Sequence, residues 1–260
     1  MTTIALPNHQ LSSGGENEPR QLVFDFPITP RYGFDNFVVC DGNRTPFRMA
    51  RLVVDGGHRL LYLFGPSGSG KTHLLRAMGQ AFYQLGGGEG FPYLSFRQAE
   101  EIYGGDYSPE RPSLLAERFA GAPILLIDDL QLMPDDEAVR VELWQLFNDF
   151  YLSGRPIVIT GDRSPRELAN IDGHLSSRLL WGLVAELDVS DDESRRRILA
   201  KLAEDRQILL PGDVIDYLIT FLPRDIPSLL SALDILRRYA LATGRRITTR
   251  LAREVLAAKG

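Results

Sequence analysis

The amino-acid sequence predicts an α/β fold, a parallel sheet flanked by helices, followed by a small all-helical lid domain. The first observation is a phosphate-loop pattern at 65–72, placed between an apolar run and a helical pattern. The second is an apolar run at 124–127 that ends in two aspartates. The third is a change after residue 190 to helical periodicity without any strand pattern. We expect a tail over 1–28, an α/β domain over 29–189 and a helical domain over 190–260.

The phosphate-loop pattern reads GPSGSGKT and fits the G-x-x-x-x-G-K-[ST] spacing at every position. Its glycines permit a tight turn that aims backbone N–H groups inward, and the helix that follows adds the partial positive charge of its N-terminus. Lys71 would reach the terminal phosphates of a nucleotide, and the Thr72 hydroxyl would hold Mg²⁺. The alternative, an ordinary Gly-rich turn, is disfavoured because the strand before the loop, the loop residues and the helix after it all fit the phosphate-loop pattern. The predicted nucleotide-binding residues are Gly65, Pro66, Ser67, Gly68, Ser69, Gly70, Lys71 and Thr72.

Two carboxylates follow the apolar run at 124–127, which predicts a strand buried on both faces. Parallel sheets place their ligands at the carboxyl ends of the strands. Asp128 is therefore placed to hold the water shell of Mg²⁺, and Asp129 to orient or deprotonate an attacking water. The alternative is a solvated acidic turn, which is less favoured because the phosphate-loop pattern occurs in the same chain.

The other segments place these motifs in the fold. Thr160 and Asp162 lie at the end of a further buried strand, where polar side chains could sense a γ-phosphate. The aromatic-rich connector at 29–39 either walls an adenine pocket or packs on the core, and the pattern does not choose between them. A proline in the strand at 91–96 indicates a sheet edge. Strands are expected at 60–64, 91–96, 124–127, 156–160 and 183–187, and helices at 48–54, 72–85, 112–120, 135–152, 191–207, 213–221, 226–242, 249–258, from about 97 and from Ser164.

Composition sets limits on function. The 260 residues are 44% apolar and 24% charged, which is ordinary for a globular protein. The net charge of −5 gives the chain no sequence-independent attraction to nucleic acid, and a basic stretch from 237 onward is read as a solvated helix face rather than a nucleic-acid or partner patch. Cys40 is the only cysteine, which excludes an internal disulfide and favours a reducing cytoplasm. We see no signal peptide and no apolar run long enough to span a membrane.

The first twenty residues are polar and rich in turn formers, which predicts a disordered tail. The stretch 21–27, QLVFDFP, interrupts this composition. An apolar peptide beside such a tail is either the first strand of the fold or a docking peptide. On pattern alone the strand is favoured.

These motifs together resemble the AAA+ ATPases, and within them the family of the replication initiator DnaA and its shorter relative Hda. The resemblance runs from about residue 21 to the end of the chain. The phosphate loop with His73 resembles the Walker A motif, 126–131 the Walker B motif, and 159–163 the sensor 1 segment with Asp162. The resemblance implies ATP or ADP with Mg²⁺ as cofactors. It also implies that 30–39 contacts adenine, through Tyr32, Phe37 and Val38.

Residues 175–183 resemble the box that carries the family's arginine finger and place that finger at Arg178. The resemblance implies that the Arg178 guanidinium reaches nucleotide held by a neighbouring subunit, where it stabilises charge during phosphoryl transfer. It also implies assembly through the AAA+ interface, either as a homo-oligomer or with DnaA.

Two features favour the Hda side of the family. The chain ends at Gly260 after the lid pattern, so we expect no helix-turn-helix domain and no strong sequence-specific DNA binding. The stretch 21–26 is similar to the peptide with which Hda relatives dock on the replicase sliding clamp, which reverses the strand interpretation. The clamp-binding residues implied by this resemblance are Gln21, Leu22, Phe24 and Phe26.

One position departs from the family pattern. The sensor 2 arginine, early in the third lid helix, is replaced by Pro227, and Arg224 lies one turn earlier. We therefore expect weak hydrolysis at most by the chain itself. The resemblance implies a regulator that promotes hydrolysis of DnaA-bound ATP and limits re-initiation. The alternative is an AAA+ loader or scaffold that delivers another replication protein to DNA.

Overall fold

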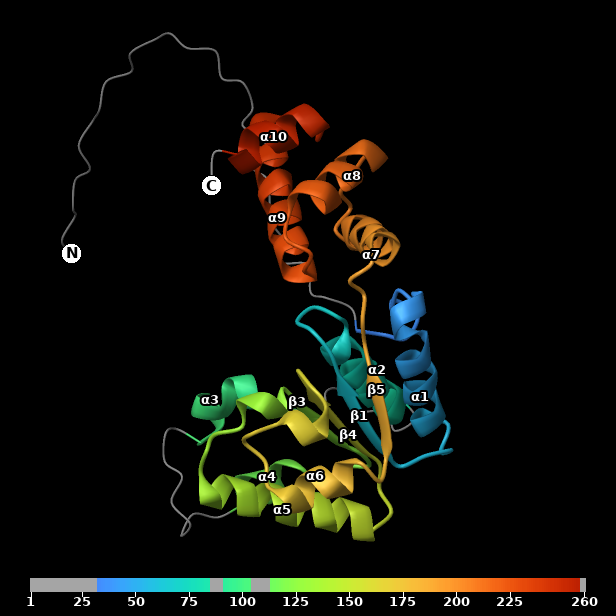
Figure 1. Cartoon of the computed structure of the whole chain (residues 1–260), viewed down its shortest axis with the longest axis vertical. Coiled ribbons are helices and arrows are strands. Elements are labelled where there is room, and N and C mark those ends of the chain that lie inside the picture. The colour runs from blue at the N-terminus through green and yellow to red at the C-terminus, as the bar shows by residue number, and fades with distance from the viewer. Residues whose placement is uncertain (1–31, 85–90, 104–112, 258–260) are drawn as a thin grey trace, which may run out of the picture.

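The computed structural model describes residues 32–84, 91–103 and 113–257. In this part of the chain, five parallel strands form one sheet in the order β2-β3-β4-β1-β5 (Figure 1). The predicted parallel sheet followed by a helical domain is confirmed. The strands are β1 (Leu60–Phe64), β2 (Leu94–Ser95), β3 (Leu125–Asp128), β4 (Ile157–Gly161) and β5 (Leu183–Glu186).

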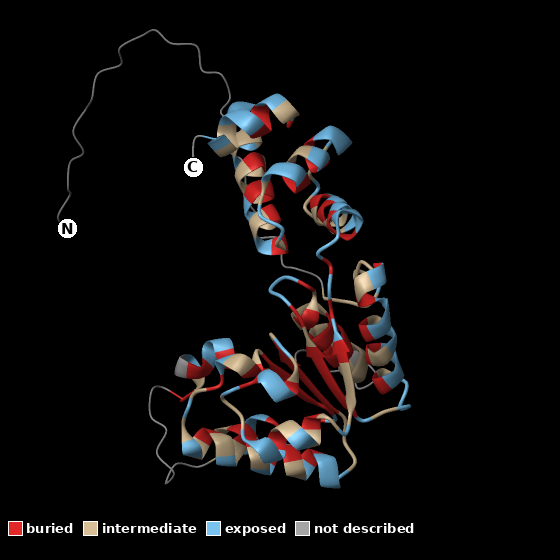
Figure 2. Cartoon of the chain, viewed as in Figure 1, coloured by how far each residue is buried: buried red, intermediate tan, exposed pale blue. Residues whose placement is uncertain are grey.

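Helices cover both faces of the sheet (Figure 1). Successive side chains of a strand point to opposite faces, so in β1 Leu60 and Tyr62 join one hydrophobic cluster while Leu61 and Leu63 join the other. Strands β1 to β4 are accordingly buried along most of their length, whereas the edge strand β5 is only partly buried (Figure 2). Helices α1 (Arg44–Val54) and α2 (Lys71–Gln84) pack on one face, and α3 (Ala99–Tyr103), α4 (Leu114–Arg118), α5 (Glu137–Leu152) and α6 (Gly173–Leu179) pack on the other.

After β5 the described chain is helical and builds a core of its own. Asp191 caps α7 by accepting from the Ser194 N–H at 2.8 Å, and Asp225 caps α9 by accepting from the Ser228 N–H at 2.7 Å. The lid helices are α7 (Asp192–Asp205), α8 (Gly212–Phe221), α9 (Ile226–Thr243) and α10 (Thr249–Ala257). Short 3-10 turns are η1 (Asp41–Asn43), η2 (Phe96–Gln98), η3 (Leu130–Leu132) and η4 (Pro165–Glu167).

The start of α9 lies directly against the phosphate loop at Gly68. A Cβ atom added to Gly68 would lie 2.6 Å from Cδ of Pro227 and 2.9 Å from Cβ of Ile226. Gly68 also has φ of +77°, a conformation that side-chain-bearing residues avoid. The glycine therefore lets the lid approach the loop at van der Waals distance.

Some predicted elements differ in length from the observed ones. The run at 91–96 forms a strand only at Leu94–Ser95, because it pairs with β3 at two positions before the chain turns into η2. It does lie at the sheet edge, as its proline indicated. Helix α1 begins earlier than predicted and α4 is shorter.

The helix predicted from Ser164 is limited to the single 3-10 turn η4. The capping box is present, with the Ser164 N–H donating to Oε2 of Glu167 at 3.2 Å. The turn nevertheless stops as η4, because Leu168 is extended and buried in the core. The helix of this region is α6, which starts from a cap at Asp172 and was not predicted.

Replacing Gly68 with alanine should lower the free energy of unfolding by about 1–2 kcal/mol, because the left-handed conformation is strained for alanine and the new methyl group meets α9. Urea unfolding measures the change. Gly212→Ala is the matched control, since no atom lies within 4 Å of a Cβ at that position and its φ is not positive. Equal stability of the two variants would contradict the tight contact between loop and lid.

Candidate functional site

A cavity of about 1100 Å³ lies between the carboxyl edge of the sheet, the phosphate loop and the lid. Parallel strands bring their carboxyl ends to one edge, which is why residues from distant stretches meet there. The predicted site residues that line this cavity are Tyr32, Phe37, Val38, Ser67, Gly68, Ser69, Gly70, Lys71, Thr72, His73, Asp128, Asp129 and Asp162.

The Lys71 ammonium is held inside the phosphate loop by the backbone of the loop. Its Nζ donates to the carbonyl oxygens of Gly65 and Pro66, each at 2.8 Å. Burial lowers the pKa of Lys71, and the charges of the nearby aspartates oppose that shift. The buried hydroxyl of Ser69 has no hydrogen-bond partner within the described residues. Phosphate oxygens would supply partners to both side chains, so the loop fits a phosphate group.

The Asp128 carboxylate is buried and accepts three hydroxyl donors. Its Oδ2 accepts from Oγ1 of Thr72 and from the phenol of Tyr93, each at 2.7 Å, and its Oδ1 accepts from Oγ1 of Thr160. Burial, followed by the charge of Asp128, raises the pKa of the Tyr93 phenol, so Tyr93 remains a donor. These contacts fix the direction of the carboxylate before any ligand binds.

The residues at this edge fit Mg²⁺. Within the described ranges no group of three or more His, Cys, Asp or Glu residues is arranged to hold a metal ion. Mg²⁺ that arrives with a nucleotide needs only one or two protein oxygens, since water and phosphate complete its octahedron. Thr72 could supply its hydroxyl directly, and Asp128 could contribute partly through water.

The Asp129 carboxylate is occupied by groups of its own chain. Oδ2 accepts from Nε of Arg97 at 3.2 Å, and Oδ1 accepts from Nε2 of Gln131 at 3.0 Å. The residue has left-handed φ and ψ of 58° and 47°, and its N–H donates to Oγ1 of Thr160 at 3.1 Å. Both carboxylate oxygens therefore already accept a side-chain donor, and an attacking water would have to compete with Arg97 and Gln131 for them.

Asp162 lies at the end of β4 and is paired with its neighbour. Nε and Nη2 of Arg163 donate to the two carboxylate oxygens at 3.0 and 2.8 Å, and these bonds lower the pKa of Asp162. Asp162 is therefore a fixed negative charge at the cavity wall. Thr160, predicted with it as a phosphate sensor, instead links Asp128 and the backbone of Asp129.

The aromatic connector lines the cavity and also packs on the core. The structure is therefore compatible with both interpretations of this segment, a wall for adenine and core packing. Phe37 stacks on Phe47 with ring centroids 5.6 Å apart and meets the His73 ring edge-on at 5.2 Å. His73 Nε2 donates to the Gly33 carbonyl at 2.9 Å, and burial lowers the pKa of His73. A planar base would lie between this wall and the apolar lid residues, which are Ile198, Leu202, Ile226 and Leu230.

The lid brings no unpaired cation to this cavity within the described residues. Lys201 pairs with Asp205 at 2.9 Å, and Arg206 pairs with Asp234 at 3.5 Å. Arg224, the other residue considered for the sensor 2 position, is exposed and does not line the cavity.

Arg178 is separated from the other predicted site residues. It lies in α6 and does not line the cavity, and its guanidinium carbon is 4.3 Å from the ring centroid of Trp181. The predicted clamp-binding residues Gln21, Leu22, Phe24 and Phe26 fall outside the described residues.

Tyr93 and Arg97 are site residues that the sequence pattern does not predict. Both belong to the short edge strand region, where pairing of Leu94 with Ile127 brings them beside the two aspartates. No motif marks either residue, because the contact depends on register between strands 30 residues apart along the chain.

A parallel sheet with a phosphate loop after β1, two aspartates at the end of β3 and a helical lid together define an AAA+ module. Residues 28–186 match the family described as the bacterial DnaA ATPase domain, and residues 192–256 match the family described as the lid domain of Hda. The chain belongs to the DnaA family of AAA+ proteins and carries an Hda-type lid.

Relatives and solved structures agree with this assignment. The chain is 31% identical over 245 residues to the chromosomal replication initiator protein DnaA of Limosilactobacillus reuteri, covering 93% of this chain and 56% of that protein. It spans about half the length of the curated relatives it matches. Domain III of Thermotoga maritima DnaA superposes with a TM-score of 0.79 at 30% identity, covering 90% and 98% of the two chains.

A structure of DnaA from Aquifex aeolicus bound to AMPPCP has the same fold, with a TM-score of 0.69 at 24% identity, covering 82% of this chain and 67% of that one.

None of the helices in the described ranges has the length and apolar character needed to cross a membrane.

Replacing Arg97 with alanine should raise the chain's own weak rate of ATP hydrolysis about two- to fivefold. This factor corresponds to the free energy of one exposed ion pair, which is at most about 1 kcal/mol. The reason is that Asp129 loses the cation that occupies it. Single-turnover hydrolysis of radiolabelled ATP measures the rate.

Arg97→Lys keeps the charge and should behave like the wild type, while Asp129→Asn added to Arg97→Ala should remove the gain. A lower rate in Arg97→Ala would instead mean that Arg97 contacts the phosphates.

Proposed function

We propose that this protein is an Hda-type regulator of replication initiation. It binds ATP or ADP with Mg²⁺ in its own cavity, and presents Arg178 to ATP that is bound by DnaA. Hydrolysis of that ATP then inactivates the initiator and limits re-initiation in the cytoplasm. The observation that carries the proposal is the position of Arg178, which is held on the outside of the module and away from its own nucleotide cavity.

The surroundings of Arg178 suit delivery to a neighbour. Its guanidinium carbon lies 4.3, 5.6 and 5.8 Å from the ring centroids of Trp181, Tyr151 and Trp144. Cation–π contacts of this kind hold a guanidinium without using its N–H donors. The donors therefore remain available for phosphate oxygens of a partner, where an arginine finger stabilises the charge of the transition state.

The protein's own nucleotide has a structural role in this proposal. Asp129 is paired with Arg97, and the lid cations Lys201 and Arg206 are paired with lid carboxylates. Both features oppose hydrolysis of a nucleotide in this cavity, whereas the phosphate loop and the apolar lid residues favour its binding. We infer that bound nucleotide keeps lid and loop together.

Docking on the sliding clamp completes the proposal. The peptide 21–26 would bind the clamp through Gln21, Leu22, Phe24 and Phe26. Attachment to a clamp on DNA would raise the local concentration of the regulator near DnaA, as tethering generally does.

Arg178→Ala should reduce the stimulated hydrolysis of DnaA-bound ATP by about a hundredfold or more, because a finger is worth several orders of magnitude in related phosphoryl transfers. The assay measures phosphate release from ATP-loaded DnaA with clamp on DNA. Arg178→Lys should rescue little, since it lacks the planar fork.

Arg140→Ala is the matched control, because Arg140 is a surface arginine paired with Asp135 and should be dispensable. Full stimulation by Arg178→Ala would refute the finger role. A thermal melt of each variant separates this result from misfolding.

The second candidate function is an AAA+ loader or scaffold that contacts DNA or cargo through the basic end of the lid. The structure gives several of these arginines partners: Arg245 pairs with Glu254 at 3.1 Å, and Arg253 lies 5.6 Å from the Tyr217 ring centroid. Such partners are typical of a solvated helix face, which supports the regulator.

A clamp pull-down distinguishes the two functions. The wild-type protein should bind the clamp, and Gln21→Ala with Phe24→Ala should abolish that binding, because the clamp pocket loses its polar and aromatic anchors. The double variant should retain nucleotide binding, which serves as its control. Salt-dependent binding to single-stranded DNA together with no clamp binding would favour the loader.

A further inference from the structure

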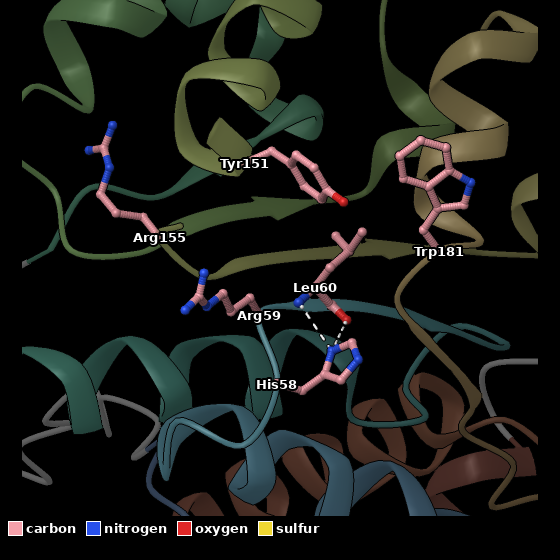
Figure 3. Close-up of a pocket in the computed structure, with 6 residues that line it drawn as sticks. All are labelled: His58, Arg59, Leu60, Tyr151, Arg155 and Trp181. Atoms are coloured by element: carbon pink, nitrogen blue, oxygen red, sulfur yellow. Dashed lines mark hydrogen bonds between the residues drawn. The ribbon is translucent and has the colours of Figure 1, made fainter. Parts of the chain in front are cut away.

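A second hollow, of about 440 Å³, lies at the amino-terminal edge of the sheet, opposite the nucleotide cavity. The two sites share no lining residue. The hollow is bounded by the start of β1, the end of α5 and the turn that follows α6 (Figure 3). The residues that line it are His58, Arg59, Leu60, Tyr151, Arg155 and Trp181.

Two aromatic rings form one wall of the hollow. Tyr151 and Trp181 have ring centroids 6.2 Å apart, and Trp181 is 57% exposed. Leu152, next to Tyr151, is 82% exposed. Exposed Trp and Tyr side chains gathered beside arginines have the composition of an interface hot spot rather than of an ordinary surface.

Two guanidinium groups give the hollow its charge. Arg155 is fixed by donating to Oγ of Ser153 at 2.8 Å and to the Ala122 carbonyl at 3.0 Å, and its guanidinium covers the Phe150 ring. Arg59 is exposed, and neither arginine forms an ion pair with a carboxylate in the described part of the chain. No acidic residue lines the hollow, so an incoming carboxylate would meet only positive charge.

The opposite wall is held rigid by local contacts. The His58 ring nitrogen Nδ1 lies 3.2 Å from the Leu60 carbonyl oxygen and 3.4 Å from its backbone nitrogen (Figure 3). The head of Arg59 lies over the turn after α5, since a Cβ on Gly154 would be 2.7 Å from its Nη1. The receptor is therefore formed before a ligand arrives, which lowers the entropic cost of binding.

The hollow is continuous with the arginine finger. Trp181 and Tyr151 line the hollow, and the same two rings hold the guanidinium of Arg178. A partner whose phosphates reach Arg178 must therefore cover or approach these rings. The walls, the charge and this continuity favour one occupant, an acidic side chain on the surface of that partner.

We propose that the hollow receives a carboxylate side chain of the ATP-bound DnaA domain that Arg178 engages. This inference rests on the proposed function. In this arrangement Arg59 and Arg155 set the affinity of the complex, and Arg178 sets the rate of hydrolysis within it.

The test titrates ATP-loaded DnaA with wild-type protein, Arg59→Ala and Arg59→Glu, with clamp-loaded DNA held constant. Arg59→Glu should raise the half-stimulating concentration about tenfold and Arg59→Ala several-fold, with the maximal rate unchanged. The half-stimulating concentration of Arg59→Ala should also depend less on salt, because one charge pair is lost. Arg48→Ala, an exposed arginine on α1 across the sheet, is the matched control.

Each other outcome is distinguishable. No stimulation by the wild-type protein would overturn the proposed function and this inference together. Wild-type stimulation with an unchanged half-stimulating concentration for Arg59→Glu would overturn the inference alone. A lower maximal rate at unchanged half-stimulating concentration would also overturn it, since Arg59 would then act on the chemistry. A further outcome is that Arg59→Glu leaves stimulation intact but sediments as a monomer where the wild-type protein sediments as a dimer. The occupant of the hollow would then be a second copy of this chain.

Discussion

The buried carboxylate of Asp128 is the contact on which the carboxyl edge of the sheet depends. It is 1% exposed and accepts hydroxyl donors from Thr72, Tyr93 and Thr160. These donors belong to α2, to the segment before β2 and to β4, so one charge fixes three neighbouring segments. A hydrogen bond to a charged group contributes about 1.5–3 kcal/mol, so these three hydrogen bonds stabilise the carboxyl edge of the sheet.

The two edges of the sheet carry opposite chemistry. Aspartates and the phosphate loop meet at the carboxyl edge, and arginines with aromatic rings meet at the amino edge. Arginines do lie at the carboxyl edge, but Arg97 and Arg163 are paired there with Asp129 and Asp162, and Arg97 occupies the carboxylate that could activate water. A module built in this way suits binding of nucleotide at one edge and presentation of a guanidinium at the other.

The sequence was most informative where a short pattern determines the chemistry. The phosphate loop and Asp128 follow from local spacing, because a tight turn and a strand end need only adjacent residues. Tyr93 and Arg97 could not be predicted, since their positions depend on the pairing of Ser95 with Asp128. The shortness of the helix at Ser164 has a related cause: its cap is local and correct, but Leu168 is extended and buried in the core, so the helix ends after one turn.

The lid contributes shape rather than charge to the nucleotide cavity. Pro227 packs on the loop at Gly68, and the lining cations Lys201 and Arg206 are satisfied by lid carboxylates. In the described part of the chain no unpaired lid cation lines this cavity, so the lid offers no free positive charge for a γ-phosphate. The rings that hold Arg178 do not line this cavity, so the residues that position this arginine are separate from those that would contact a nucleotide. In the proposed regulator, this chain therefore binds its own nucleotide without rapid hydrolysis, and the ATP that is hydrolysed is the one bound by its partner.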